Sequence, residues 1–348
     1  MKGNIEIGTA KAAPGFKAFG ELQVSLRPDG SWITVPVSIV NGSEEGPVLW
    51  LQAGSHGEEV GGTFCVNEVV NNLDPSKVRG AVVGIPVINT PSWMVSNFST
   101  VGQRLTPTDY KNLNRVYPGD PKGSLSDQIA YVVFEEMKKW ASVLVDCHDG
   151  GWSFTEAPLV IFHKTSDSKF NLKQREMARA LLLEVVWITT QGGVEGSLAG
   201  KADACSKAAE LGIPSFALEL TGSYNFPEGY EYSVGGRVKG ILNLMRFMGM
   251  LEGKVESIKQ DVVVDPWFKG VKHGGMLHYK AELGQVVKKG EVIAEIRDVF
   301  YRNVVDTFVC PFEKGMIIVR RAHPTVNPGD WVVNIGSVVE DEEKLLNS

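Results

Sequence analysis

Cysteine is scarce in this 348-residue sequence, and its spacing excludes two kinds of site. The four cysteines lie far apart and form no Cys-x-x-Cys pair: Cys65, Cys147, Cys205 and Cys310. Single, widely separated cysteines predict neither a disulfide framework nor a cysteine-rich zinc site. A small, disulfide-stabilised secreted domain is therefore not expected.

Long apolar runs and an excess of positive charge are also absent. No apolar stretch approaches the roughly 20 residues that a transmembrane helix needs, and residues 1–20 lack the continuous apolar segment of a signal peptide. The net charge of −6, spread without long acidic runs, argues against nucleic acid as the main partner. We therefore expect a soluble, cytoplasmic protein that binds neither nucleic acid nor membranes.

Predicted strands and helices alternate through the first 258 residues. Residues 1–40 predict an opening β segment, and the unbroken apolar run at 47–54 is typical of a strand covered on both faces. A helix from Glu59 to about Leu73 and a strand at 80–89 would complete a right-handed βαβ unit. Further helices are expected at 124–140, 171–185, 202–211 and 232–251, and further strands at 142–146 and 213–220. This order predicts an α/β domain whose mostly parallel or mixed sheet is flanked by helices.

The composition changes near residue 260. From 259 to 348, short segments rich in Val and Ile and punctuated by Gly and Pro predict a small all-β domain without a substantial helix. This domain resembles the barrel-sandwich hybrid of biotinyl and lipoyl carrier domains, which carry a modified lysine after a strand of the "GEVIAEI" type. Here that place reads "RDVFYRN", with no lysine between Lys289 and Lys314. We therefore expect two domains, 1–258 and 259–348, the second without a covalent cofactor.

Polar side chains follow two of the predicted strands. His56 and Glu59 follow the strand at 47–54, and His148 ends the motif "LVDCH". Ligands of open α/β sheets bind beyond the carboxyl ends of the strands, so these side chains are expected in the right region. Two imidazoles and one carboxylate form the ligand set of a catalytic zinc site with an open position for water. Each histidine alone is more often an ordinary hydrogen-bonded residue, but their joint occurrence favours a metal site.

The remaining histidines and Cys147 are not expected to take part. His163 is placed in a loop, and the other three histidines fall in the β domain. No His-Glu-x-x-His motif is present, which argues against a thermolysin-like site. Strand alternation points Cys147 away from its neighbours, so we do not expect it to act as a nucleophile.

A hydrolytic zinc site also needs a general base. Glu219 lies inside the otherwise apolar run "FALEL". A buried carboxylate without a partner is costly, and a metal-bound water is one partner that would also suit a base. The alternative is a structural carboxylate held by Thr221 or by backbone amides.

Such a site also needs a cation for the carbonyl oxygen and donors for the substrate. The long segment 90–123 supplies two arginines and two asparagines: Arg104, Arg115, Asn112 and Asn114. Guanidinium groups bind carboxylates and polarise carbonyls, and neighbouring amides add donors. Long connections of this kind are often functional, so we expect this one to reach the site.

Five motifs in order resemble the succinylglutamate desuccinylase/aspartoacylase family, in its predicted deacylase branch. They are "GSHGEE", "INTPSW", "QRLTPTDYKNLNRVYPG", "LVDCHDGG" and "PSFALELTGS", followed by a hairpin-rich β domain. The resemblance covers roughly residues 30–340 and implies the zinc carboxypeptidase-like fold. It also implies one Zn²⁺ per chain held by His56, Glu59 and His148, with Glu219 as general base and Arg104 on the scissile carbonyl.

The same resemblance implies the remaining roles. Asn114 and Arg115 would bind the substrate carboxylate, and Asp146 would orient one of the two imidazoles from behind. The Asp-Leu-Asn-Arg form of the family motif is here Asn-Leu-Asn-Arg, with Asn112 in the place of the aspartate. This departure does not affect the implied metal ligands. It leaves open which substrate is preferred and what Asn112 contributes to that preference.

Three functions are compatible with these residues. The first is hydrolysis of a small N-acyl amino acid, with N-acetyl compounds preferred and N-acetyl-diaminobutyrate as one specific substrate. The second is a metallocarboxypeptidase for peptide C-termini, which would use the same ligands; the β domain favours the small substrate, because in the resembling family it narrows the site entrance. The third is a non-catalytic binding or carrier module, against which the missing lysine weighs. Family members often associate, so a homo-oligomer is also expected.

Overall fold

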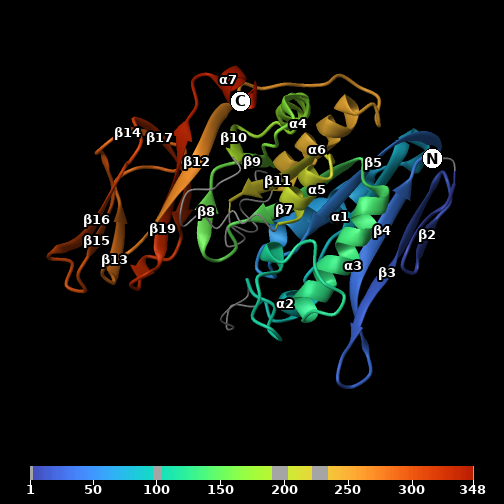
Figure 1. Ribbon diagram of the computed structural model, residues 1–348, viewed down its shortest axis with the longest axis horizontal. Coiled ribbons are helices and arrows are strands. Elements are labelled where there is room, and N and C mark those ends of the chain that lie inside the picture. The colour runs from blue at the N-terminus through green and yellow to red at the C-terminus, as the bar shows by residue number, and fades with distance from the viewer. Residues whose placement is uncertain (1–2, 97–103, 190–202, 222–233, 348) are drawn as a thin grey trace.

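The computed structural model describes residues 3–96, 104–189, 203–221 and 234–347. Within these residues a mixed sheet of 13 strands runs through the whole molecule (Figure 1). In spatial order the strands are β14 (Val286–Lys288), β17 (Lys314–Arg321), β19 (Trp331–Val338), β12 (Asp261–Gly270), β10 (Val185–Thr189), β9 (Leu159–His163), β11 (Ser215–Leu220), β7 (Val143–Asp149), β5 (Glu44–Ala53), β6 (Arg79–Ile85), β4 (Trp32–Asn41) and β3 (Phe16–Leu26), with β8 (Phe154–Glu156) paired to β17.

The centre of this sheet is parallel, as predicted. Strands β11, β7, β5 and β6 run in one direction, and α1 (Val60–Asn72) connects β5 to β6 as the expected βαβ unit. Strand β9 runs antiparallel to β11 and parallel to β10, which makes the sheet mixed. Because β5 and β7 are neighbours, the segments that follow them meet at one edge of the sheet.

Helices cover both faces of the central strands. The apolar side chains of α1, α4 (Ser168–Ala180) and α6 (Gly236–Phe247) pack on one face. Those of α3 (Leu125–Trp140), α5 (Ala204–Glu210) and the hairpin of β1 (Ile5–Ile7) and β2 (Ala10–Ala12) pack on the other. A capping box between Ser124 and Asp127 begins α3. No helix of the described residues is long and apolar enough to cross a membrane.

The C-terminal segment is rich in β structure, as predicted, and is joined to the central sheet. A second, antiparallel sheet is formed by β13 (Gly275–Tyr279), β15 (Val292–Arg297), β16 (Val304–Val309) and β18 (Thr325–Val326). Strand β12 pairs with β10 on one side and with β19 on the other, so the large sheet continues past the expected division at 258/259. That division stays a prediction.

Three expectations about secondary structure were wrong. The helix expected at 171–185 ends at Ala180, because Leu182 has a positive φ of 58° and the β-branched run that follows forms β10. His163 ends β9, since the apolar run before it forms a strand between β10 and β11. The strand expected at 80–89 ends at Ile85, before the short helix α2 (Thr90–Met94). The C-terminal part ends in a short helix, α7 (Glu342–Asn347), that contacts α4. The beginning of the helix expected at 232–251 lies outside the described residues.

Candidate active site

Three residues that commonly bind metals converge where β5 and β7 end. His56, Glu59 and His148 are all buried, and one ligand atom of each lies within 4.8 Å of the others. The Glu59 carboxylate lies between the two rings, with Oε1 2.7 Å from Nδ1 of His56 and Oε2 2.7 Å from Nδ1 of His148. The convergence of these three side chains, expected from the sequence, is thus present in the fold.

The outer nitrogen of each ring is engaged by another side chain. Nε2 of His56 lies 3.0 Å from Oδ1 of Asn112. Nε2 of His148 lies 3.3 Å from Oδ2 of Asp146 and 3.3 Å from Nδ2 of Asn114. Partners on the outer nitrogens fix the orientation of imidazole ligands, so both rings present Nδ1 to the centre of the cluster. Asp146 therefore stands behind His148 rather than His56, which the sequence could not distinguish.

The donor atoms suit a metal ion. Two imidazole nitrogens and a carboxylate are a set that zinc accepts in catalytic sites, where one position stays open. Burial lowers the pKa of His56 to about 4, so this ring is neutral near pH 7, as a metal ligand must be. Burial would also lower the pKa of His148, but the carboxylates of Asp146 and Glu59 outweigh it and raise this pKa well above the ordinary value. Negative charge therefore lies on both sides of the His148 ring, from Glu59 at Nδ1 and from Asp146 at Nε2.

Close packing of α1 on β7 places Glu59 beside His148. Oδ2 of Asp149, at the end of β7, accepts a hydrogen bond of 2.9 Å from the backbone N–H of Gly61 in the first turn of α1. A Cβ on Gly62 would lie 2.4 Å from the carbonyl oxygen of Cys147, so only glycine permits this approach. The helix that begins after Glu59 is thereby fixed to the strand that carries His148.

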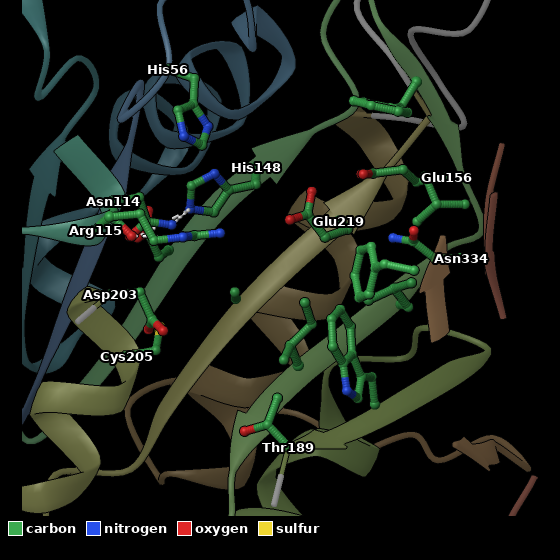
Figure 2. Close-up of a pocket in the computed structure, with 18 of the residues that line it drawn as sticks. His56, Asn114, Arg115, His148, Glu156, Thr189, Asp203, Cys205, Glu219 and Asn334 are labelled. Atoms are coloured by element: carbon green, nitrogen blue, oxygen red, sulfur yellow. Dashed lines mark hydrogen bonds and ion pairs between the residues drawn. The ribbon is translucent and has the colours of Figure 1, made fainter. Parts of the chain in front are cut away.

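Glu219 lies on β11 directly beside His148 on β7, its register partner. Burial raises the pKa of Glu219, and the charge of His148 and the neighbouring carboxyl of Glu156 offset part of this rise. Figure 2 shows Glu219 between His148 and Glu156. Within the described ranges, no N–H or O–H group reaches Oε2 of either carboxyl. Glu219 therefore has its raised pKa beside the metal-type cluster, where a general base would be needed.

The segment 104–115 reaches the cluster as expected. Nη1 of Arg104 donates a hydrogen bond of 2.9 Å to Oε1 of Glu59. The Asn-Leu-Asn-Arg motif forms the 3₁₀ turn η2 (Leu113–Arg115), where the Asn112 side chain accepts from the backbone N–H of Asn114 at 2.9 Å. Arg104, Asn114 and Arg115 line the cavity beside the cluster, whereas Asn112 is held against His56. The substrate-binding roles of Asn112, Asn114 and Arg115 stay predictions.

The cluster opens into a cavity. Its empty volume, including the part that is open to solvent at the mouth, is about 880 Å³. One wall holds the histidines and arginines already described, and the floor comes from β9, β10 and β11. The opposite wall comes from β8 and the C-terminal strands, and consists of Phe154, Glu156, Phe268, Val319, Trp331 and Asn334. Sequence reasoning missed this wall, because nothing in the local sequence of these residues shows that β8 and β12 join the C-terminal strands to the central sheet.

A second missed group lies at another side of the same cavity. Oγ1 of Thr189 lies 2.6 Å from Nδ1 of His163, and Nε2 of His163 lies 3.2 Å from Oδ1 of Asp203. Asp203 also caps α5 by accepting from the backbone N–H of Ser206 at 2.8 Å. Recognising β9 and β10 as strands would have placed His163 and Thr189 at this edge.

Cys147 is unsuited to nucleophilic chemistry. Its side chain packs in the core on the face of α1 and α6, opposite to His148. A hydrogen bond with Cys65, together with burial, raises the pKa of the Cys147 thiol well above its ordinary value. The expectation that Cys147 points away from the site is confirmed.

The fold and the site together define an amide-bond hydrolase. The family model for the succinylglutamate desuccinylase/aspartoacylase catalytic domain matches residues 45–233, more than half of the chain, and the protein belongs to this family. The chain is 28% identical over 332 residues to the N-alpha-acetyl-L-2,4-diaminobutyric acid deacetylase of Halomonas elongata, covering 92% of each.

Solved structures share the whole fold. A succinylglutamate desuccinylase/aspartoacylase from Rhodobacter sphaeroides matches with a TM-score of 0.79 at 22% identity, over 93% of this chain and 96% of that one. The product-bound ectoine utilization protein of Ruegeria pomeroyi matches with a TM-score of 0.78 at 22% identity, over 92% of this chain and 95% of that one. Both matches extend through the C-terminal strands, beyond the region of the family model.

Proposed function

We propose that the protein is a zinc-dependent deacylase that hydrolyses the amide bond of a small N-acyl amino acid, with an N-acetyl group as the first expectation. The convergence of His56, Glu59 and His148 with Glu219 and Arg104 in one cavity carries this proposal. The Halomonas relative, named for an N-acetylated diamino acid, supports it. One zinc ion per chain, the cytoplasmic location and a homo-oligomer remain predictions.

The residues of the cavity account for the proton transfers of the reaction. Zinc held by Nδ1 of both histidines and by Glu59 would act as a Lewis acid and lower the pKa of water. Glu219 accepts the proton of the attacking water and returns it to the leaving amine, for which its raised pKa is suited. Arg104 brings a guanidinium to the negative charge that develops on the amide oxygen.

The charged side chains of the cavity indicate how the substrate would bind. Arg115 lines the cavity and donates through Nη1 to the carbonyl oxygen of Asn114 at 2.6 Å, which holds its guanidinium on the wall. A guanidinium with adjacent amide donors suits the carboxylate of an amino acid. The acyl group and the amino-acid side chain would then occupy the rest of the cavity.

A metal analysis combined with a substrate panel tests the proposal. The purified protein, reconstituted with zinc and desalted, is expected to retain about one zinc per chain and to release amine from N-acetyl amino acids. The His56→Ala variant serves as the metal-binding control and should retain less zinc. Short peptides with free C-termini belong in the panel: their preferential cleavage would establish a metallocarboxypeptidase, and a protein without metal or amide hydrolysis would indicate a binding module.

A further inference from the structure

A second cavity lies behind one wall of the active-site cavity. Phe154 and Glu156 of β8 line the active-site cavity, whereas Thr155 between them lines the second one. On the neighbouring strand β17, Val319 and Arg320 alternate in the same way. Successive residues of a strand point to opposite faces of a sheet. The paired strands β8 and β17 therefore separate the two cavities.

Two arginines line this second cavity. Its empty volume, including the part that is open to solvent, is about 680 Å³. The side chains of Arg320 and Arg321 are only 22% and 21% exposed. Nε of Arg321 is buried and has no hydrogen-bond partner among the described residues. Buried donors without an acceptor are rare in folded proteins, and a bound ligand is one explanation.

Each arginine has an acidic neighbour that leaves it able to bind an anion. Nη1 of Arg320 donates a hydrogen bond of 2.7 Å to Oε2 of Glu282, whose side chain is 84% exposed. Ion pairs with such exposed partners contribute little to stability, so a ligand can replace Glu282 at small cost. Nη2 of Arg321 lies 3.1 Å from Oδ2 of Asp330, which leaves its Nε for another acceptor. The guanidinium of Arg320 is held over the ring of Tyr279, 4.0 Å from its centroid.

The rest of the lining is mainly apolar. Leu277, Leu283 and Pro324 belong to it, and among the described residues it includes no acidic side chain. Guanidinium groups bind carboxylates through paired hydrogen bonds, and apolar walls are best covered by hydrocarbon. Inorganic phosphate would leave these walls in contact with water, and an amine would be repelled by the two guanidinium groups. The lining therefore matches a carboxylate that carries a short hydrocarbon chain.

We propose that the cavity between β8, β17 and β13 is a second binding site, which takes a small aliphatic carboxylate with its head group at Arg320 and Arg321. A ligand bound there would contact Thr155, one residue from Glu156, and would lie against the back of the active-site wall. The inference does not depend on the proposed deacylase function.

Titration calorimetry with butyrate tests this site on the zinc-loaded, full-length protein. Because Arg115 of the active-site cavity could also bind a carboxylate, the measurement is made in the Arg115→Gln variant. Butyrate should bind about 3- to 10-fold more tightly than acetate, because its longer chain covers more of the apolar wall. Inorganic phosphate should bind more weakly than butyrate, and n-butylamine should not bind. Adding Arg321→Gln should weaken butyrate binding by about 10- to 100-fold.

A second variant keeps both arginines and closes the site in another way. Ala322 lines the cavity and is half-buried, so Ala322→Glu would add a carboxylate that competes with the ligand. It should weaken butyrate binding as Arg321→Gln does, and it carries the test if Arg321→Gln does not fold, which thermal unfolding shows. The matched control is Arg302→Gln, because Arg302 also belongs to the C-terminal part and is exposed. It should leave butyrate binding unchanged.

Three results would overturn the inference. Butyrate binding that both cavity variants leave unchanged would place the ligand elsewhere, in the active-site cavity or on the surface. Absence of butyrate binding in the Arg115→Gln protein would show that Arg115, not this cavity, binds the carboxylate. Phosphate binding tighter than butyrate binding would show that the apolar wall does not select the ligand.

Discussion

Among single residues, Glu219 allows the most specific prediction, because its carboxyl is buried beside His148 and the carboxyl of Glu156. Glu219→Gln keeps the shape and a hydrogen bond to Glu156 but removes the base. We expect kcat to fall by about 100- to 10,000-fold with the zinc content unchanged. Glu210→Gln, at the exposed end of α5, is the control and should match the wild type. Parental turnover in Glu219→Gln would show that another group takes the proton.

The raised pKa of Glu219 also predicts the pH dependence of turnover. Burial is the main cause, and it raises the pKa above the ordinary 4.5. Since the base must be ionised, kcat/KM should fall as the pH falls through the raised value, so the acid limb should lie above pH 4.5. A pH–rate profile of the zinc-saturated enzyme measures it. An acid limb at or below 4.5, or the same limb in Glu219→Gln, would contradict the assignment.

At the scale of elements, the contact between α1 and β7 determines whether Glu59 reaches the cluster. Gly62→Ala would place a Cβ 2.4 Å from the carbonyl oxygen of Cys147 and push the helix away. We expect a loss of about 1–3 kcal/mol in the free energy of unfolding and weaker zinc binding. Gly236→Ala is the matched control, because a Cβ on this helical glycine of α6 meets no atom within 4 Å. Denaturant unfolding and zinc titration of both variants test this, and equal stabilities would refute the steric role of Gly62.

The elements also show which parts of the site the sequence could predict. The strands before His56 and His148 were predictable, because each is an apolar run that ends in ligand-type residues. Strand β10 was not, since "LLLEV" continues the helical pattern and only the backbone at Leu182 ends it. The pairing of β8 with β17 joins segments more than 150 residues apart, and no local pattern encodes it. Glu156, unlike Glu219, therefore left no signal in the sequence.

At the scale of the whole molecule, the large sheet makes the C-terminal strands part of the cavity. Strand β12 links them to the catalytic strands through β10, and the aromatic wall of Phe268 and Trp331 thereby faces the histidines. The sequence led us to expect a separate β domain without a covalent cofactor, and that expectation stays a prediction. Because Phe268 and Trp331 line the cavity, the C-terminal strands lie where they can contact a bound substrate.

Metal binding should stabilise the whole chain, because its ligands join β5, the start of α1 and β7 at the centre of the sheet. A ligand that binds only the folded state stabilises it by about 2.7 kcal/mol at 100 times its Kd. We expect zinc to raise Tm and a chelator to reverse the rise. His56→Ala should lose the zinc-dependent rise, whereas His163→Ala, which removes a strand-end imidazole of the same cavity, should keep it. Differential scanning fluorimetry of the wild type and both variants, with and without zinc, measures the effect. An equal rise in Tm in the wild type and both variants would mean that zinc binds elsewhere.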